Sequence, residues 1–181
     1  MSKVIKNRYF ACAIMLLSII LCIGFDTYFS LNKMHSQTEQ SFYKPENTAI
    51  QTQLDNKASS ANKISNLAKK YYQTTELIIS DIVNAANELA NADTISKKYE
   101  INNSLNRAVD ALYYAMNNNS SVNRGDLTTL SSLYNEYNSY NDAILKSGYN
   151  QSADEYNAIL SRFPANIVQN ITNLKSAEVF K

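Results

Sequence analysis

The sequence predicts an all-α protein in which an N-terminal transmembrane helix is followed by an antiparallel four-helix bundle with long helices. Glycine and proline number only 3 and 2 among 181 residues, so the chain is poor in the turn residues of an all-β fold. Apolar residues alternate at spacings of three and four along several long segments, which is the period of one helix face. An uncharged apolar run over residues 9–25 is the expected anchor.

The anchor also sets the expected topology. As a helix, residues 9–25 would be about 26 Å long, which is the short end of what crosses a bilayer. Residues 1–8 form a basic tip with three Lys or Arg and no acid, and Lys33 is the only base soon after the run. The positive-inside rule therefore predicts a single-pass protein of the cell membrane, with residues 1–8 in the cytoplasm and the remainder outside.

Two other interpretations of the apolar run stay open, a cleaved signal peptide and a lipoprotein. Against the first, the run is longer than the usual apolar core of a signal, and no small-x-small cleavage site follows it. Against the second, Leu21 before Cys22 is larger than the residue usual at that place. We therefore prefer an uncleaved anchor.

Composition argues against several classes of function. The net charge is +1, and the 14 bases outside the tip face all 16 acids, so nucleic-acid binding is not expected. Cys12 and Cys22 both lie in the apolar run, which leaves no disulfide framework and no cysteine-based zinc site for the remainder of the chain. His35 stands alone in a polar connector over residues 26–45 and is expected to be solvated, so histidine-dependent metal sites and nucleophile triads lack a partner. We expect no metal, no cofactor and no enzyme activity.

The bundle is expected over residues 46–164. Its first helix starts at Pro45-Glu46 and carries Lys57 on the apolar stripe, where the long stem should bring the ammonium to the surface. Polar residues that can cap the later helices are Thr74 or Thr75, Thr94 and Asp126. The four helices are predicted at residues 46–72, from Thr74 or Thr75 to about 91–93, from Thr94 to about 116, and at 126–164. We also predict a bend at Gly148 and a tail over 165–181 that can form a short amphipathic helix.

An aromatic residue recurs every seven positions at the end of the last helix. The pairs are Tyr149-Asn150, Tyr156-Asn157 and Phe163-Pro164. On a helix this spacing gives one stripe, which predicts a core-facing seam in which the asparagines fix the register and Pro164 ends the helix. The alternative is a tyrosine-lined groove for a peptide or a glycan.

These three pairs, with the apolar tail from Ile167 to Phe180, resemble the C-terminal signature of the LemA family of bacterial membrane-anchored helical proteins. The first bundle helix departs from the family pattern, because Asn56-Lys57 stands where a double arginine is usual. The resemblance implies a membrane-anchored helical bundle with coiled-coil packing at the bacterial cell envelope. It brings no catalytic residue to this chain.

The function predicted from these observations is a non-enzymatic scaffold or protein-interaction module at the cell envelope, with the membrane and an unidentified protein as partners. Self-association is compatible with the long apolar stripes. The alternative is a ligand- or peptide-binding sensory module of the cell surface, with the ligand held between helices near the bend at Gly148.

Overall fold

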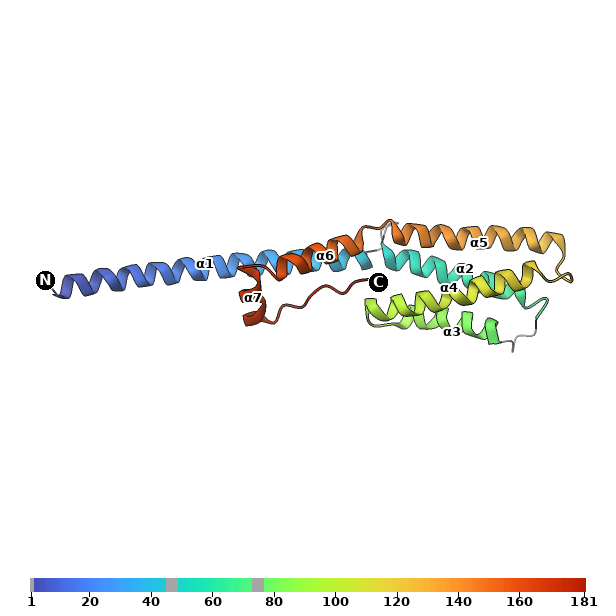
Figure 1. Cartoon of the computed structure of the whole chain (residues 1–181), viewed down its shortest axis with the longest axis horizontal. Coiled ribbons are helices and arrows are strands. Elements are labelled where there is room, and N and C mark those ends of the chain that lie inside the picture. The colour runs from blue at the N-terminus through green and yellow to red at the C-terminus, as the bar shows by residue number, and fades with distance from the viewer. Residues whose placement is uncertain (1, 45–48, 73–76) are drawn as a thin grey trace. The chain divides into compact units, whose positions relative to one another are not determined.

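The computed structural model describes residues 2–44, 49–72 and 77–181 (Figure 1). The all-α prediction is confirmed, and the described residues contain no strand. The helices are α1 (Ser2–Tyr43), α2 (Ile50–Ala68), α3 (Leu77–Asn91), α4 (Ile95–Asn117), α5 (Arg124–Leu145), α6 (Tyr149–Leu160) and α7 (Ala165–Thr172).

The chain divides into two compact units. We call them the anchor unit (Met1–Glu39 and Ala153–Ala177) and the core unit (Gln40–Ser152 and Glu178–Lys181). The helices α1 and α6 and the C-terminal tail each contribute residues to both units. The predicted last helix of a single bundle is therefore divided, since residues 153–164 belong to the anchor unit.

In the core unit, α2 packs against α3, α4 and α5, and α4 also contacts α3 and α5. The buried side chains follow the predicted stripes, because positions three and four apart share one face of a helix. Fully buried examples from the four helices are Leu54, Ile82, Leu105 and Leu130. Burial of each such side chain contributes about 1.5–3 kcal/mol of transfer free energy, which makes this shared core the main source of stability for the unit.

The helix ends match the predicted caps in part. The Thr94 hydroxyl accepts a hydrogen bond from the Lys97 N–H at 3.2 Å, as predicted. At the start of α5 the cap is Asn123, whose side chain accepts from the Asp126 N–H at 2.8 Å, and Asp126 lies inside the first turn. The predicted starts at Pro45-Glu46 and at Thr74 or Thr75 fall outside the described residues.

The irregularity predicted at Gly148 is present. Gly148 has a φ of +72°, a left-handed conformation that costs little only for glycine, and it separates α5 from α6. The helix α6 ends at Leu160, ahead of Pro164, which forms the N-cap of α7. The tail beyond Asn173 has no regular secondary structure.

In the anchor unit, α1 continues through the region where a polar connector was expected. Residues 26–43 hold no glycine or proline, so nothing in the backbone ends the helix there. His35, expected to be solvated, is largely covered, and its ring lies 5.3 Å from the Tyr156 ring of α6 in an edge-to-face contact.

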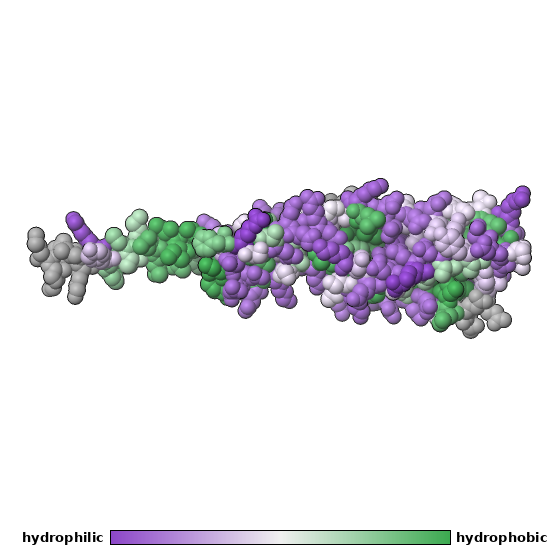
Figure 2. Space-filling model, viewed as in Figure 1, coloured by the Kyte–Doolittle hydropathy of each residue, from purple (hydrophilic) through white to green (hydrophobic). Residues whose placement is uncertain are grey.

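The helix α1 is long and apolar enough to cross a membrane. Its large apolar side chains between Tyr9 and Phe25 are exposed. Figure 2 shows the hydrophobic residues gathered along this part of the chain.

Candidate functional site

The C-terminal tail is held by the two Tyr-Asn pairs of α6, one in each unit. In the core unit the Asn150 amide donates to the Phe180 carbonyl at 2.8 Å and accepts from the Phe180 N–H at 2.7 Å. The Tyr149 hydroxyl donates to the Glu178 carbonyl at 2.6 Å. We call this arrangement the core-unit clamp.

The side chains of Phe180 and Glu178 also make contacts within the core unit. The Phe180 ring is buried and lies 5.9 Å from the Phe42 ring and 5.3 Å from the Tyr99 ring. The Glu178 carboxylate accepts hydrogen bonds from the N–H groups of Ile95 and Ser96 at 2.7 and 3.2 Å. Because those N–H groups belong to the first turn of α4, the tail supplies a negative charge where the helix dipole favours one.

The anchor-unit clamp repeats this arrangement. The Asn157 amide donates to the Ala177 carbonyl at 2.9 Å and accepts from the Ala177 N–H at 2.8 Å. The Tyr156 hydroxyl donates to the Lys175 carbonyl at 3.2 Å. Burial raises the pKa of Tyr156, and the charge of Glu39 raises it further, so the hydroxyl stays a donor at neutral pH.

The asparagine of each clamp pairs with the main chain of one tail residue and not with its side chain. A primary amide has one acceptor oxygen and a donor group, so it can pair with the C=O and the N–H of a single residue, as a neighbouring β-strand would. Seven residues of helix rise about 10.5 Å, and three residues of extended chain span about 10 Å. The heptad spacing of the asparagines therefore matches the three-residue step from Ala177 to Phe180.

The structure places the six signature residues differently from the predicted seam. The rings of Tyr149 and Tyr156 are buried, but Asn150 and Asn157 bind the tail instead of fixing a helix register. Phe163 was expected on the same stripe and is 80% exposed, because α6 ends at Leu160 before reaching it. The tail was not predicted as the partner of the asparagines. The available signal was the agreement between the heptad step and a three-residue extended step.

A second polar cluster lies inside the core unit around Lys57. The Lys57 Nζ donates to the Asn102 Oδ1 at 2.7 Å and to the Asn141 Oδ1 at 2.8 Å, and it lies 4.9 Å from the centre of the Tyr137 ring. The Tyr137 hydroxyl in turn donates to the Asn106 Oδ1 at 2.7 Å. Two helices besides α2, namely α4 and α5, thus surround a single ammonium group, with amide oxygens and an aromatic face as its ligands.

The prediction that Lys57 reaches the surface is wrong, because Lys57 is 0% exposed. Burial lowers the pKa of Lys57 to about 7, and the negative charge of Asp110 opposes that change. A lysine with such a pKa can act as a nucleophile or a base elsewhere, but a fully buried amine offers no approach to a substrate. The cluster is therefore structural in this conformation.

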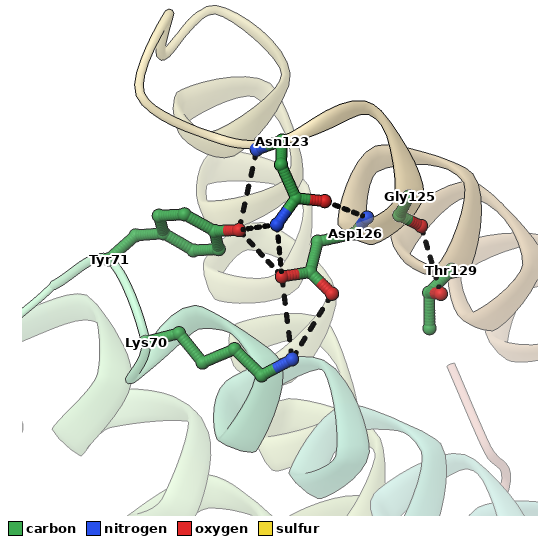
Figure 3. A network of polar contacts seen from close by, with 6 residues as sticks. All are labelled: Lys70, Tyr71, Asn123, Gly125, Asp126 and Thr129. Carbon is green, nitrogen blue, oxygen red and sulfur yellow. Dashed lines mark hydrogen bonds and ion pairs between the residues drawn. The ribbon is translucent and has the colours of Figure 1, made fainter.

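A third network joins the end of α2 to the start of α5, and Figure 3 shows its members converging on Asp126. The Tyr71 hydroxyl donates to the Asp126 carboxylate at 2.6 Å, and the Lys70 ammonium lies 3.1 Å from the same group. The Asn123 Nδ2 donates to the Tyr71 hydroxyl at 2.7 Å. The hydrogen bond from Tyr71, followed by that from Lys70, lowers the pKa of Asp126. The network fixes one end of the core unit.

Metal-binding geometry is absent from the part of the chain that the structure describes. No three His, Cys, Asp or Glu side chains there come close enough together to hold an ion. A groove between α3 and α4 is lined by Asp81, Glu88 and Arg107 together with three alanines. The two clamps are thus the arrangement with the clearest recognition chemistry.

Comparison with known proteins agrees with the C-terminal signature. The model of the LemA family matches residues 46–181, which is well over half of the chain and includes both clamps and the tail. No curated protein matches the chain.

Proposed function

The chain belongs to the LemA family, and we propose that it is a non-enzymatic, single-pass membrane protein whose helices serve as a scaffold or protein-interaction module at the bacterial cell envelope. In this proposal α1 anchors the chain, with the N-terminus in the cytoplasm and the helices from α2 onward outside. The observation that carries the proposal is the exposed apolar surface of α1 between Tyr9 and Phe25.

Exposure of that surface to water is unfavourable in free energy, and this supports its role as a membrane anchor. Isoleucine, leucine and phenylalanine side chains stay exposed on successive turns of one helix, and each would gain about 1.5–3 kcal/mol on full transfer out of water. Contiguous apolar patches of this kind mark protein or membrane contacts. The basic tip before the run and the sparse basic residues after it favour a cytoplasmic N-terminus.

The topology is tested by adding protease to intact cells that carry the full chain with an epitope at the N-terminus. We expect the helices α2 to α5 to be cut while the epitope stays attached to the membrane. A matched variant with Lys3, Lys6 and Arg8 all changed to Glu should weaken this orientation, because it removes the positive tip. Full protection of the helices in intact cells would overturn the outward topology.

The interaction role is tested by crosslinking in intact membranes followed by identification of the captured proteins. Surface-exposed lysines such as Lys63 and Lys70 provide attachment points on the core unit. We expect one or a few proteins to be captured reproducibly, and a chain lacking the core unit should lose them. Capture of lipid and of copies of this chain alone would contradict the scaffold role.

A second candidate function is favoured by the clamps. Two asparagines that pair with the N–H and C=O of an extended chain, whatever its side chains, form the chemistry of a peptide-binding module. The tail occupies these asparagines in the structure, so a peptide from another protein would have to replace it.

This candidate predicts exchange between the tail and added peptide. We expect the full chain to bind a fluorescent peptide of tail residues 174–181 weakly, and Ala177→Pro to bind it more tightly, because proline removes the N–H that donates to Asn157. Ser176→Pro is the control, since the Ser176 N–H takes part in neither clamp. If Ala177→Pro, Ser176→Pro and Asn157→Ala all bind the fluorescent peptide with the same affinity, the clamps are excluded as a peptide site.

A further inference from the structure

The helix α7 presents apolar side chains outward. Ile167 and Ile171 are four residues apart and therefore lie on one side of α7, and Phe163, just ahead of the helix, lines the same groove as both of them. Phe163, Ile167 and Ile171 are 80%, 49% and 75% exposed. We call them the α7 row.

The orientation of the row is fixed by the opposite side of the helix. Ala165 and Val168 are buried, so α7 is packed onto the anchor unit through these residues. The helix itself contains no charged residue. The packing therefore leaves the apolar row accessible to solvent, and α7 itself has no charge that would favour contact with bulk water.

The row continues the apolar surface of α1. Leu21, Phe25 and Tyr28 of α1 and Phe163, Ile167 and Ile171 of the α7 segment line one groove of about 480 Å³ in the anchor unit. Its walls are almost entirely apolar, and its volume lies in the range of sites that bind a small apolar molecule. On α1 these residues lie around the C-terminal end of the uncharged run, where Asp26 is the first charge.

The charges around α7 suit one kind of partner. Between Tyr156 and Ala177 the chain has two bases, Arg162 and Lys175, and no acid. Both bases are exposed, and they lie on either side of α7 in the sequence. An apolar row flanked by basic side chains matches a lipid surface, in which acyl chains lie below anionic phosphate groups.

We propose that α7 is a second membrane contact of this protein, with the α7 row inserted among acyl chains of the leaflet that α1 leaves and Arg162 and Lys175 at the phosphate groups. The inference rests on the proposed anchoring by α1, since the groove shares its wall with the end of that span. Lipid is favoured over a protein partner because the row is continuous with the surface that the bilayer covers.

The absence of tryptophan from the sequence makes a direct test possible. Ile171→Trp and Phe163→Trp each give the full chain a single tryptophan in the α7 row, and Tyr114→Trp puts one at a 60% exposed aromatic position on α4. Each variant is reconstituted into vesicles of phosphatidylcholine and phosphatidylglycerol, with and without brominated acyl chains, and its emission is recorded.

We expect Ile171→Trp and Phe163→Trp to emit at shorter wavelength than Tyr114→Trp and to lose more than about half of their emission to brominated lipid, as for an interfacial helix. Tyr114→Trp should lose little. Two row variants are used so that a local effect of one substitution does not decide the result.

Carbonate extraction of the same vesicles separates the two hypotheses. If the chain resists extraction but both row variants emit and respond to brominated lipid like Tyr114→Trp, the inference about α7 fails and the α1 anchor stands. If carbonate removes the chain from the vesicles, the proposed anchoring itself fails. A blue-shifted emission that brominated lipid does not quench would mean that protein covers the row, and this outcome also overturns the inference.

Discussion

The two units differ in which side chains they bury and which they expose. The core unit encloses an ammonium group, Lys57, among its buried side chains, whereas the anchor unit leaves most of the large apolar side chains of its long helix exposed. Both would be costly for a protein that lies entirely in water. The core unit is therefore specified by internal packing and hydrogen bonds, whereas the exposed apolar surface of the anchor unit suits apolar surroundings and not water.

The largest effect is expected when apolar volume is removed, and the two units should respond differently to it. Leu105→Ala in the core unit should lower the free energy of unfolding by about 2–5 kcal/mol, because it opens a cavity among fully buried side chains. Leu16→Ala in the exposed part of α1 should leave that free energy unchanged. Denaturant unfolding of both full-length variants in detergent checks the pair, and equal losses would contradict the division into units.

The second test uses the titration of Lys57. Its pKa is about 7 in the folded chain against 10.5 for the free group, so between these values the unfolded chain holds a proton that the folded chain does not. Stability should therefore rise with pH through this window, at most by about 1.4 kcal/mol per pH unit. From pH 7 to pH 9 the gain should be on the order of 2 kcal/mol. The measurement is the denaturant midpoint at each pH.

Two variants on the same helix separate Lys57 from other groups. Lys57→Met should remove most of this slope, whereas Lys63→Met, at an exposed ion pair with Glu136, should keep it. The range stops at pH 9 because burial also raises the pKa of Tyr137, so tyrosines of the unfolded chain begin to ionise first above that pH. A slope that survives in Lys57→Met would refute the assignment.

The third test compares the two clamps. Asn150→Ala leaves the Phe180 N–H and C=O without their partner and should cost about 1–3 kcal/mol, and Asn157→Ala should do the same at Ala177. Hydrogen exchange of the Phe180 and Ala177 amides measures each clamp separately. We expect each substitution to accelerate its own amide more than the other. Equal acceleration of both amides by either substitution would mean that the tail is released as a whole.

The smallest effect is expected at the junction of α2 and α5. The pKa of Asp126 lies below its ordinary value, so the stability that its charge contributes is present above the unfolded pKa and is lost as pH falls through the folded one. Asp126→Asn should abolish that acid-side loss while disturbing the core unit little, because the group is near the surface. Thermal unfolding between neutral pH and pH 3 measures it, with Tyr71→Phe as the matched removal of the shortest hydrogen bond. An unchanged acid profile in both variants would show that the network has no role in stability.

Local patterns in the sequence were sufficient for most of the fold. Stripes at spacings of three and four predicted the buried faces of α2 to α5, and Thr94 was recognised as a cap from its residue type and place. The break at Gly148 followed from the offset between two stripes. Over residues 26–43 the structure continues α1, since this polar stretch contains no glycine or proline that would end a helix.

Only part of the candidate site could be predicted from the sequence. The heptad of Tyr149 and Tyr156 marked the right helix, and the peptide groove was among the interpretations, but the partner of Asn150 and Asn157 is a segment 20 to 30 residues further along. No periodicity within α6 contains that information. Phe163 has the same spacing of seven in the sequence as Tyr149 and Tyr156, but it does not lie on their stripe, because α6 ends at Leu160.

The helical class, the long apolar N-terminal helix, the break at Gly148 and the family were determined by the sequence, because each depends on the intrinsic preferences of neighbouring residues or on their pattern along the chain. The surroundings of Lys57 were decided only by tertiary structure, since its ligands Asn102 and Asn141 lie 45 and 84 positions away. The same holds for the tail in its clamps and for the outward row on α7. A side chain's burial depends on which distant segments pack over it, and that information is absent from the residues beside it.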